Sequence, residues 1–465
     1  MLRRSLRLST VLLFLVSAAA YASRGRFLPA VSYPTGTDPY FVAIGDFNGD
    51  GKQDLAVVNY YDNSIKILLG KENGTFQSGK TLSGCMDSGA IQTGDLNGDS
   101  RADLIVTCAG PVSGVMVLLN SASGFLAPTV YASGGTNPNS LVIADLDGDG
   151  ILDVVVVHAS GILGFLKGNG DGSFQAPSTY DVGGLADSVV AADFNGDHYL
   201  DLVVGGCDIG ACLFLGNGDG TFQFSLGFST GGEVHAGGLA YGDFNGDGHL
   251  DLAVANTSYS SSDKFASIIL GNGDGSFQPP ASYTVGKSPQ SVTVADFNGD
   301  GVPDVAVAIG SGAVTVMYGR GDGSFPLIRQ FAAGLTAWFV TAADFNRDRA
   351  EDLAVVDLAG DGVWILLNSG GTFVTATSSE NPAPAGQPVT FTATIAPSLI
   401  STIPTGTVQF ADGTTILATV PLDQNGVASY TTSGLTTGTH TIRTKYSGDS
   451  NFNPNTGQPI VQVIQ

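Results

Sequence analysis

A nine-residue acidic pattern, Asp-x-(Asn/Asp)-x-Asp-x-x-x-Asp, occurs seven times in this chain of 465 residues. Each copy begins 48 to 53 residues after the previous one, and short apolar runs rich in β-branched residues flank it. Repeats of about fifty residues with strand-like flanks are typical of stacked or radial β units. The pattern therefore predicts an all-β repeat protein. The copies begin at Asp46, Asp95, Asp145, Asp193, Asp243, Asp296 and Asp344.

Each copy places side-chain oxygens at positions 1, 3, 5 and 9, and the backbone carbonyl of position 7 adds another. Calcium binds roughly six to eight oxygens, and alternating acidic residues in a tight turn converge on one point. The loop closes with Asp at position 9 rather than Glu at position 12, and strand-like sequence flanks it, so a β-hairpin calcium loop is favoured over an EF-hand. Turn formation alone also selects Asp, Asn and Gly, but it does not require the closing Asp.

The sequence thus predicts up to seven calcium ions as cofactors. The third loop has four carboxylates and is expected to bind best, whereas the seventh carries Arg347 and Arg349 and is expected to bind worst. Position 6 favours a residue that tolerates positive φ, so Ser100 and His198 weaken the second and fourth loops. The predicted ligands are Asp46, Asn48, Asp50, Lys52 and Asp54; Asp95, Asn97, Asp99, Arg101 and Asp103; Asp145, Asp147, Asp149, Ile151 and Asp153; Asp193, Asn195, Asp197, Tyr199 and Asp201; Asp243, Asn245, Asp247, His249 and Asp251; Asp296, Asn298, Asp300, Val302 and Asp304; and Asp344, Asn346, Asp348, Ala350 and Asp352.

The charge of the chain agrees with metal binding. There are 42 acidic and only 19 basic residues, and the formal net charge is −23. The seven loops hold just over half of the acidic residues, so the acidity is mostly ligand charge. Without a basic cluster beyond the first residues, binding to nucleic acid or to an anionic membrane is disfavoured.

The first 22 residues have the pattern of a secretory signal peptide. Arginines stand at positions 3, 4 and 7, an apolar run covers residues 12–20, and Ala20-Tyr21-Ala22 is a small-x-small cleavage site. The mature chain is expected to begin at Ser23, to contain no transmembrane segment, and to be secreted or held at the cell surface or in the periplasm.

Export makes the four cysteines candidates for disulfides. Two local pairings, Cys85–Cys108 and Cys207–Cys212, are predicted over the two other connectivities. Cys207 and Cys212 lie at the ends of a hairpin turn, and Cys85 and Cys108 flank the first strand pair of one repeat.

Each repeat divides into four strands. In the sixth repeat we expect strands at residues 291–295, 304–308 and 314–318, followed by a Gly-rich turn into a fourth strand. Seven four-stranded repeats predict a seven-bladed β-propeller. The phenylalanine after each Gly-rich turn is expected to pack between adjacent blades, namely Phe76, Phe125, Phe174, Phe222, Phe277, Phe325 and Phe373.

The repeats are out of phase with the chain ends. Residues 27–33 match residues 277–283, which belong to a fourth strand, whereas different sequence follows the seventh repeat. The N-terminus should therefore supply the missing fourth strand of the last blade and leave no open edge there.

These units resemble the FG-GAP/VCBS-type repeat family and, more distantly, the integrin α-subunit propeller. The resemblance covers roughly residues 26 to 374, through units such as Ala-Asp-Phe-Asn-Gly-Asp-Gly at 295–301, followed by Asp304, and Gly-Asn-Gly-Asp-Gly-Ser-Phe at 271–277. It implies a seven-bladed propeller, here residues 23–374, with calcium between the first two strands of each blade. Such proteins are secreted or on the cell surface and mostly bind rather than catalyse.

Residues 375–465 differ in composition and form a second expected domain. They are rich in Thr, Pro and Val, lack acidic loops, and show short alternating strands at residues 389–395, 407–410, 426–430 and 439–446. This pattern predicts an immunoglobulin-like sandwich. The segments 404–410 and 446–452 resemble bacterial Ig-like repeats, which implies a spacer.

A partner is expected on the face opposite the calcium loops. The residue six before each loop should ring a central channel, and the ring offers Tyr40, Asn139, Asp187, Gln290 and Trp338, with glycines at 89 and 237. Tyr40 and Trp338 should lie side by side, and aromatic rings beside amides suit an extracellular glycan or protein. Packing of both rings between blades is the alternative. Nearby loops add Tyr60, Tyr61, His158, His235 and Tyr259.

Catalytic motifs are absent from the sequence: there is no Gly-x-Ser-x-Gly, His-Glu-x-x-His or phosphate-binding loop. We therefore expect a calcium-binding recognition or adhesion module rather than an enzyme. Two alternatives stay open. One is a propeller polysaccharide lyase or other carbohydrate-active enzyme, for which Arg329 and Lys287 are the candidate basic residues, and the other is a purely structural extracellular module.

Overall fold

The computed structural model describes residues 27–110, 113–232, 235–257, 265–399 and 402–465. The described chain is built from β-strands and one short 3-10 helix, η1 (Leu358–Gly360). The expected signal peptide lies outside the described residues. Within those residues, no helix has both the length and the apolar character needed to cross a membrane.

Seven antiparallel sheets of four strands are found in the described residues, and we number them 1 to 7. Sheet 1 contains β2 (Pro39–Gly45), β3 (Asp54–Asn59), β4 (Ser64–Gly70) and β5 (Phe76–Ser83). Sheet 2 contains β6 (Ser88–Gly94), β7 (Asp103–Cys108), β8 (Gly114–Leu118) and β11 (Thr129–Ala132), beside a small ribbon of β9 (Asn120–Ser121) and β10 (Gly124–Phe125). Sheet 3 contains β12 (Pro138–Ala144), β13 (Asp153–His158), β14 (Ile162–Leu166) and β15 (Ser178–Asp181).

The remaining repeats follow the same order. Sheet 4 contains β16 (Ser188–Ala192), β17 (Asp201–Cys207), β18 (Gly210–Gly216) and β19 (Phe222–Phe228). Sheet 5 contains β20 (His235–Gly242), β21 (Asp251–Thr257), β22 (Phe265–Ile269) and β23 (Ala281–Thr284). Sheet 6 contains β24 (Pro289–Ala295), β25 (Asp304–Ile309), β26 (Ala313–Tyr318) and β27 (Leu327–Ala332). Sheet 7 contains β28 (Ala337–Ala343), β29 (Asp352–Asp357), β30 (Gly362–Leu366) and β1 (Val31–Pro34).

The second strand of a repeat is buried along its whole length, as β13 with the sequence Asp-Val-Val-Val-Val-His shows. Such strands are apolar without alternation because neighbouring sheets cover both of their faces. Each sheet shares one hydrophobic cluster with the next, and sheet 7 shares one with sheet 1, which contains Leu55 and Val356. The first strands of consecutive sheets also contact one another, including β28 with β2.

The N-terminal strand completes sheet 7, as the sequence predicts. β1 pairs antiparallel with β30, and Val31 lies opposite Ile365. Before it, Phe27 is buried, with its ring centroid 5.8 Å from that of Phe297 and 5.1 Å from that of Phe331. The chain start is therefore packed against sheet 6 as well as paired in sheet 7.

The repeated phenylalanines are buried or half-buried between sheets in six of the seven positions. Phe325, for example, is 2% exposed and contacts Phe244 of sheet 5. The expectation for Phe373 is wrong, because this residue lies in β31 of the C-terminal sheet, pairs with Ala396 and is 43% exposed. Since β1 takes the fourth place in sheet 7, the chain after β30 is free to enter another sheet.

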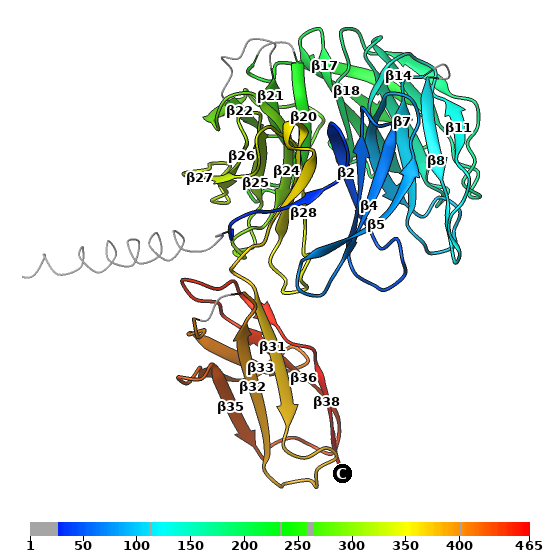
Figure 1. Ribbon diagram of the computed structural model, residues 1–465. Helices are drawn as coiled ribbons and strands as arrows, with labels where there is room; N and C mark the ends of the chain where they lie inside the picture. Colours follow the sequence, from blue (N-terminus) through cyan, green and yellow to red (C-terminus); the bar gives the residue numbers. More distant parts are fainter. Residues whose placement is uncertain (1–26, 111–112, 233–234, 258–264, 400–401) are drawn as a thin grey trace, which may run out of the picture.

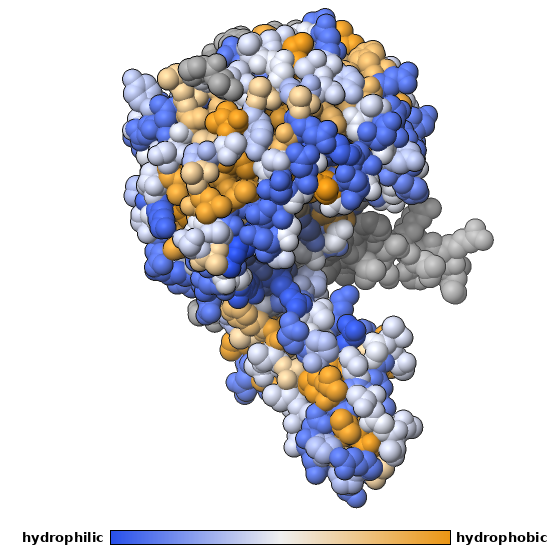
Figure 2. All heavy atoms as spheres, turned by 90° about the vertical axis from the view of Figure 1, so that its right-hand side faces the viewer, coloured by the Kyte–Doolittle hydropathy of each residue, from blue (hydrophilic) through white to orange (hydrophobic). Residues whose placement is uncertain are grey.

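The C-terminal residues form two further sheets that face each other around a core containing Phe391, Phe410 and Tyr446. This C-terminal domain extends from one end of the repeat region (Figure 1). Hydrophilic residues cover much of the repeat region beside the junction (Figure 2). The strand β31 spans the expected boundary at residues 374 and 375. The strands are β31 (Thr372–Ser378), β32 (Val389–Pro397) and β35 (Val427–Thr432) in one sheet, and β33 (Thr407–Asp412), β34 (Thr415–Pro421), β36 (Gly438–Tyr446), β37 (Asn455–Thr456) and β38 (Ile460–Ile464) in the other.

Both predicted disulfides are present. Cys85 pairs with Cys108 at a Cα separation of 5.7 Å, and Cys207 pairs with Cys212 at 6.0 Å. The first joins the entry to sheet 2 to the end of β7, and the second links neighbouring strands of sheet 4.

Candidate calcium loops and recognition face

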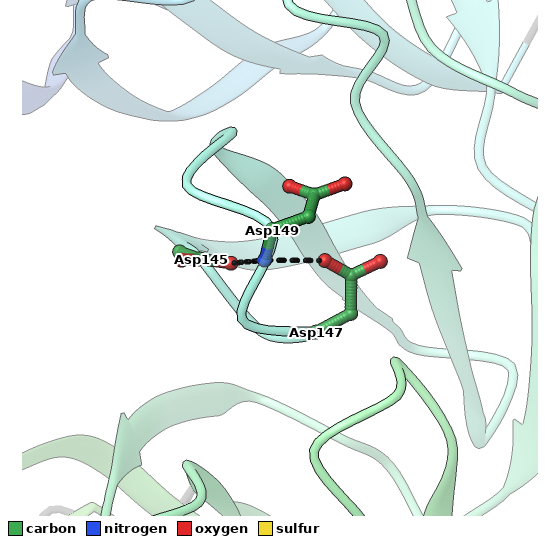
Figure 3. A group of neighbouring side chains, drawn as sticks. All are labelled: Asp145, Asp147 and Asp149. Carbon is green, nitrogen blue, oxygen red and sulfur yellow. Dashed lines mark hydrogen bonds between the residues drawn. The ribbon is translucent and has the colours of Figure 1, made fainter.

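The acidic loops connect the first and second strands of every sheet, and backbone amides hold their carboxylates in place. In the third loop, Asp145 accepts hydrogen bonds from the backbone N–H groups of Gly148, Asp149 and Gly150 at 2.8 to 3.1 Å. The N–H of Asp149 lies between the Asp145 and Asp147 carboxylates (Figure 3) and is also 3.3 Å from Asp147 Oδ1. Similar bonds to the position 1 carboxylate recur in the other loops, so one local fold presents positions 1, 3 and 5 together.

The third loop brings three carboxylates close enough for one metal ion. One oxygen each from Asp145, Asp147 and Asp149 lies within 4.8 Å of the others, and this is the single such group among the described residues. The sequence predicts this loop as the best site, and its geometry is the most favourable for a divalent cation.

A lysine that the sequence analysis missed lies on this loop. Lys167 Nζ is 3.0 Å from Asp149 Oδ2 and also hydrogen-bonds to Asp147. The hydrogen bond from Lys167 lowers the pKa of Asp149, and the same two carboxylates raise the pKa of Lys167. The sequence contains a signal for this lysine, because the equivalent position just before the Gly-rich turn holds Leu69, Leu215 or Leu270 in other repeats.

The position 9 carboxylates are buried and bind backbone on both oxygens. Asp54 Oδ2 accepts from Phe47 N at 3.0 Å, and Asp54 Oδ1 accepts from Gly70 N at 2.7 Å. The same arrangement ties each loop to the turn after the third strand in all seven repeats. The sequence analysis assigned these residues only as ligands, and it missed this structural role. Their part in metal binding stays a prediction.

Burial controls the acidity of these position 9 residues. Desolvation raises the pKa of Asp54, Asp153 and Asp201 to about 6 and that of Asp304 to about 8. Neighbouring carboxylates of the same loop act in the same direction. A bound divalent cation would favour the ionised forms.

The backbone at position 6 takes a left-handed conformation, as the sequence predicts. Ser100, His198 and Arg349 have φ of 65°, 73° and 65°, and the glycines of the other loops lie in the same region. In the seventh loop Arg347 also has positive φ, at 61°. There Asn346 and Asp348 are buried at 3% and 1% exposure, whereas both arginines are exposed.

Tyr40 and Trp338 lie in contact at the predicted face, with ring centroids 5.0 Å apart. Tyr60 extends the aromatic group, 5.5 Å from Tyr40, and Tyr61 beside it is 73% exposed. Burial, and then the nearby Asp87, raises the pKa of Tyr60. The two predicted polar neighbours also meet, because Asn139 Nδ2 lies 3.3 Å from Asp187 Oδ1.

Four further loop tips at this end of the sheets expose apolar side chains. They connect second to third strands or one sheet to the next, as Tyr60 and Tyr61 do, and they expose large side chains. These are Met86 at 56%, Leu185 at 42%, Ile209 at 57% and Leu335 at 68% exposure. Gln290 is half-buried and donates to the Ser288 carbonyl oxygen at 3.1 Å.

Two candidate residues for this face do not reach it. His158 is fully buried, and its ring nitrogens bond to the Ser133 hydroxyl at 2.8 Å and the Ile162 carbonyl oxygen at 2.9 Å. Arg329 lies on β27, the outermost strand of sheet 6, so it is no base for channel chemistry. Tyr259 and the side chain of His235 lie outside the described residues.

A cleft of about 810 Å³ lies between the sixth loop and the C-terminal domain. Asp296, Asp300 and Glu351 line it from the repeat region, and Lys445 lines it from the C-terminal side. Burial, together with nearby carboxylates, raises the pKa of Glu351. Charges of both signs therefore meet where the two bodies join.

Family comparisons match both parts of the chain. A family model for the FG-GAP-like repeat matches residues 46–106, 95–156, 145–204, 206–254, 243–307 and 296–355. A model for the bacterial Ig-like domain (group 3) matches residues 376–465. No curated protein matches the chain significantly.

Solved structures resemble the repeat region in fold. Two crystal structures of BBS1N in complex with ARL6DN, one soaked with lead and one with mercury, contain a chain with a TM-score of 0.54 and 15% identity. The alignments cover 75% and 74% of this chain and 99% and 97% of the other. At this identity the likeness supports a β-propeller fold and nothing about ligands or partners.

Proposed function

Since this chain belongs to the family of FG-GAP-like repeat proteins and carries a bacterial Ig-like domain of group 3 at residues 376–465, we propose that it is an exported calcium-binding recognition module. The seven four-stranded sheets from β1 to β30 form a closed seven-bladed propeller, in which β1 completes the last blade. The hydrophobic cluster shared by sheets 7 and 1 supports this closure. The two disulfides support a location outside the reducing cytoplasm.

The grouped carboxylates of the third loop carry the calcium proposal. Three carboxylate oxygens lie within 4.8 Å of one another, and the single charge of Lys167 offsets only part of their repulsion, so the group still attracts a divalent cation. The same loop fold recurs in every sheet, so up to seven loops offer oxygen ligands, with the fewest favourable features in the second, fourth and seventh. At ten times its Kd, each ion stabilises the folded state by about 1.4 kcal/mol.

Thermal unfolding with calcium and then with a chelator tests this function. We expect calcium to raise the unfolding temperature of the propeller, and we expect Asp145→Ala/Asp149→Ala to reduce that rise. The matched control is Asp171→Ala/Asp219→Ala, which removes two exposed carboxylates that bond only turn residues Ser173 and Thr221 among the described contacts. An unfolding temperature that ignores calcium would show that the loops are only turns.

The aromatic and apolar loop tips support recognition at the face opposite the calcium loops. Tyr61 offers an exposed ring, the half-buried Tyr40 and Trp338 add part of theirs, and Asn139 and Asp187 add polar groups, which together suit a glycan or a protein surface. The Ig-like domain lies at the other end of the sheets and acts as a spacer that leaves this face open.

Binding assays against extracellular glycans and matrix proteins test the recognition face. We expect Tyr61→Ala/Trp338→Ala to abolish binding while calcium-dependent unfolding stays unchanged. Phe224→Ala is the matched control, because Phe224 is 54% exposed on the outer strand β19, away from this face. Binding that survives the double variant would remove this face from the proposal and leave a structural module.

A further inference from the structure

The seventh loop carries arginine at the two positions where the loop backbone is left-handed. At position 4 the six other loops have glycine, with φ between 71° and 78°, whereas Arg347 has φ of 61°. At position 6, Arg349 has φ of 65°. This conformation is unfavourable for residues with a side chain, and it persists where other contacts offset the strain.

The two arginine side chains make contacts in different directions. Arg347 donates from its guanidinium to the carbonyl oxygen of Gly51, in the first loop. Arg349 donates to the carbonyl oxygen of Thr456, in the Ig-like domain. The positively charged groups of this loop thus bridge sheet 7 to sheet 1 and to the second domain.

Between the arginines, the carboxylate of Asp348 is buried, at 1% exposure. Its oxygens accept from Ala350 N and from Asn346 Nδ2, each at 2.9 Å, and the equivalent carboxylates of the fourth and fifth loops accept the same two bonds. The Ser398 hydroxyl, from the Ig-like domain, contacts this carboxylate too. A position 5 residue that would face a metal in the other loops here faces the neighbouring domain.

Backbone contacts beside the loop extend this junction. Asn453 N donates to Gly370 O at 2.8 Å, and Ser398 N donates to Gly371 O at 3.2 Å. Asn455 is 8% exposed, and its Nδ2 lies 3.5 Å from the Asp348 carbonyl oxygen. Only residues 367–371 separate β30 from β31, so the connection is short as well as bonded.

We propose that the seventh loop is a metal-free clasp that mounts the Ig-like domain rigidly on the propeller. Arg347 fastens the seventh sheet to the first loop, and Arg349 and Asp348 fasten it to the Ig-like domain. The contacts of Arg347, Arg349 and Asp348 across the junction involve no metal ion, so the angle between the domains does not depend on calcium. This inference goes beyond the proposed function, because the contacts of the clasp form whether or not the other loops bind calcium.

Distances between spin labels on the two domains test the clasp. Labels go on Ala281→Cys in β23 and Thr415→Cys in β34, which are both exposed. All four native cysteines are in disulfides. We expect one narrow distance distribution that is the same with calcium and with chelator, under conditions where circular dichroism shows the protein folded.

Three variants separate the side-chain contact from backbone strain. Arg349→Ala/Asn455→Ala and Arg349→Gly are expected to broaden the distribution at least twofold in width. Glycine relieves the left-handed strain, so Arg349→Gly should broaden the distribution without lowering the unfolding temperature of the propeller. Arg320→Ala is the control, since this exposed arginine pairs with Asp322 in its own turn.

Several results would overturn the clasp. They are an unchanged distribution in both Arg349 variants, or a wild-type distribution that shifts with calcium. A count of bound calcium gives an independent check on the wild-type fold, because Asp344→Ala should leave the number of ions per chain unchanged. Loss of one ion in that variant contradicts a metal-free seventh loop. A protein that binds no calcium at all would refute the proposed function but leave the distance test valid.

Discussion

The third loop already holds a cation of its own, the ammonium group of Lys167. Its Nζ bonds to the carboxylates of Asp147 and Asp149, two of the three that would bind calcium. A calcium ion must displace this group and then experiences its repulsion. We expect Lys167→Met to lower the calcium Kd of the third loop roughly fivefold, the effect of removing a unit charge about 8 Å from a divalent ion in water.

Isothermal titration of the wild type and the variant measures this effect. Lys66→Met is the matched control, because Lys66 Nζ bonds Gly79 O and Thr81 Oγ1 and lies on no calcium loop. An equal or weaker calcium affinity in Lys167→Met would mean that the lysine supports the loop rather than competes for it.

His158 predicts a loss of propeller stability in mild acid. Burial lowers the pKa of His158 below its usual value near 6.5. As pH falls below that value, the unfolded chain binds a proton that the folded chain does not, so the free energy of unfolding decreases, by up to about 1.4 kcal/mol per pH unit. His158→Gln removes this group. Chemical denaturation between pH 7.5 and 5 should therefore show a shallower loss in the variant than in the wild type.

His440 predicts the opposite sign in the Ig-like domain. A hydrogen bond from its ring to Asp412, at 2.6 Å, raises the pKa of His440. The folded state then binds the proton more tightly, so this contribution is complete below pH 6.5 and is lost as pH rises through the folded pKa. His440→Asn should abolish the gain on acidification. The same loss of stability at all pH values in the variant would contradict this assignment.

At the scale of the element, the seven loops share one backbone conformation but not one set of residues. Ser100 has φ of 65° where four loops have glycine. We expect Ser100→Gly to raise the free energy of unfolding by about 0.5 to 1 kcal/mol. Glycine relieves the backbone strain of the folded state, and its greater conformational entropy in the unfolded chain offsets part of that gain. Gly150→Ser is the reciprocal test and should destabilise the protein. No atom lies within 4 Å of the added Cβ, so the only cost is the left-handed backbone conformation of a residue with a side chain. A destabilised Ser100→Gly would mean that the serine hydroxyl contributes more than the strain costs.

Elements defined by local pattern could be predicted from the sequence, as could those contacts that follow from the repeat, whereas contacts made by single side chains were harder to predict. The strand expected at residues 304–308 is found at Asp304–Ile309, because its apolar run and its turn signals are local. His158 was misplaced because strands buried on both faces give no alternation to show which way a side chain points. Lys167 replaces the leucine of other repeats, but its contact was missed because it reaches its loop from just after the third strand, fourteen or more residues later in the chain.

At the scale of the whole molecule, the phase of the repeats predicts which strand completes sheet 7, whereas the sequence does not predict how the two domains contact each other. The match between residues 27–33 and a fourth strand predicts the pairing of β1 with β30 without any structure. The mounting of the Ig-like domain depends on single side chains such as Arg349 and Asn455, which carry no periodic signal. Phe373 was assigned to the wrong sheet because it follows a Gly-rich turn like the other repeated phenylalanines, although β1 already takes the fourth place in sheet 7.

The N-terminal segment should decide the stability of the whole propeller, because it joins residues at the start of the chain to the last two sheets. Phe27 is 8% exposed, and its ring packs edge-on against Phe297 and Phe331. We expect Phe27→Ala to cost about 3 to 5 kcal/mol, which is the usual loss when a buried phenylalanine leaves a cavity. Calorimetry should show the propeller transition shifted to lower temperature while the Ig-like transition stays in place. Val31→Ala is the control, since Val31 is 53% exposed on the same segment and should change stability by less than about 0.5 kcal/mol. If Phe27→Ala behaved like Val31→Ala, the seventh sheet would be held by its own three strands, and closure through the N-terminus would contribute little.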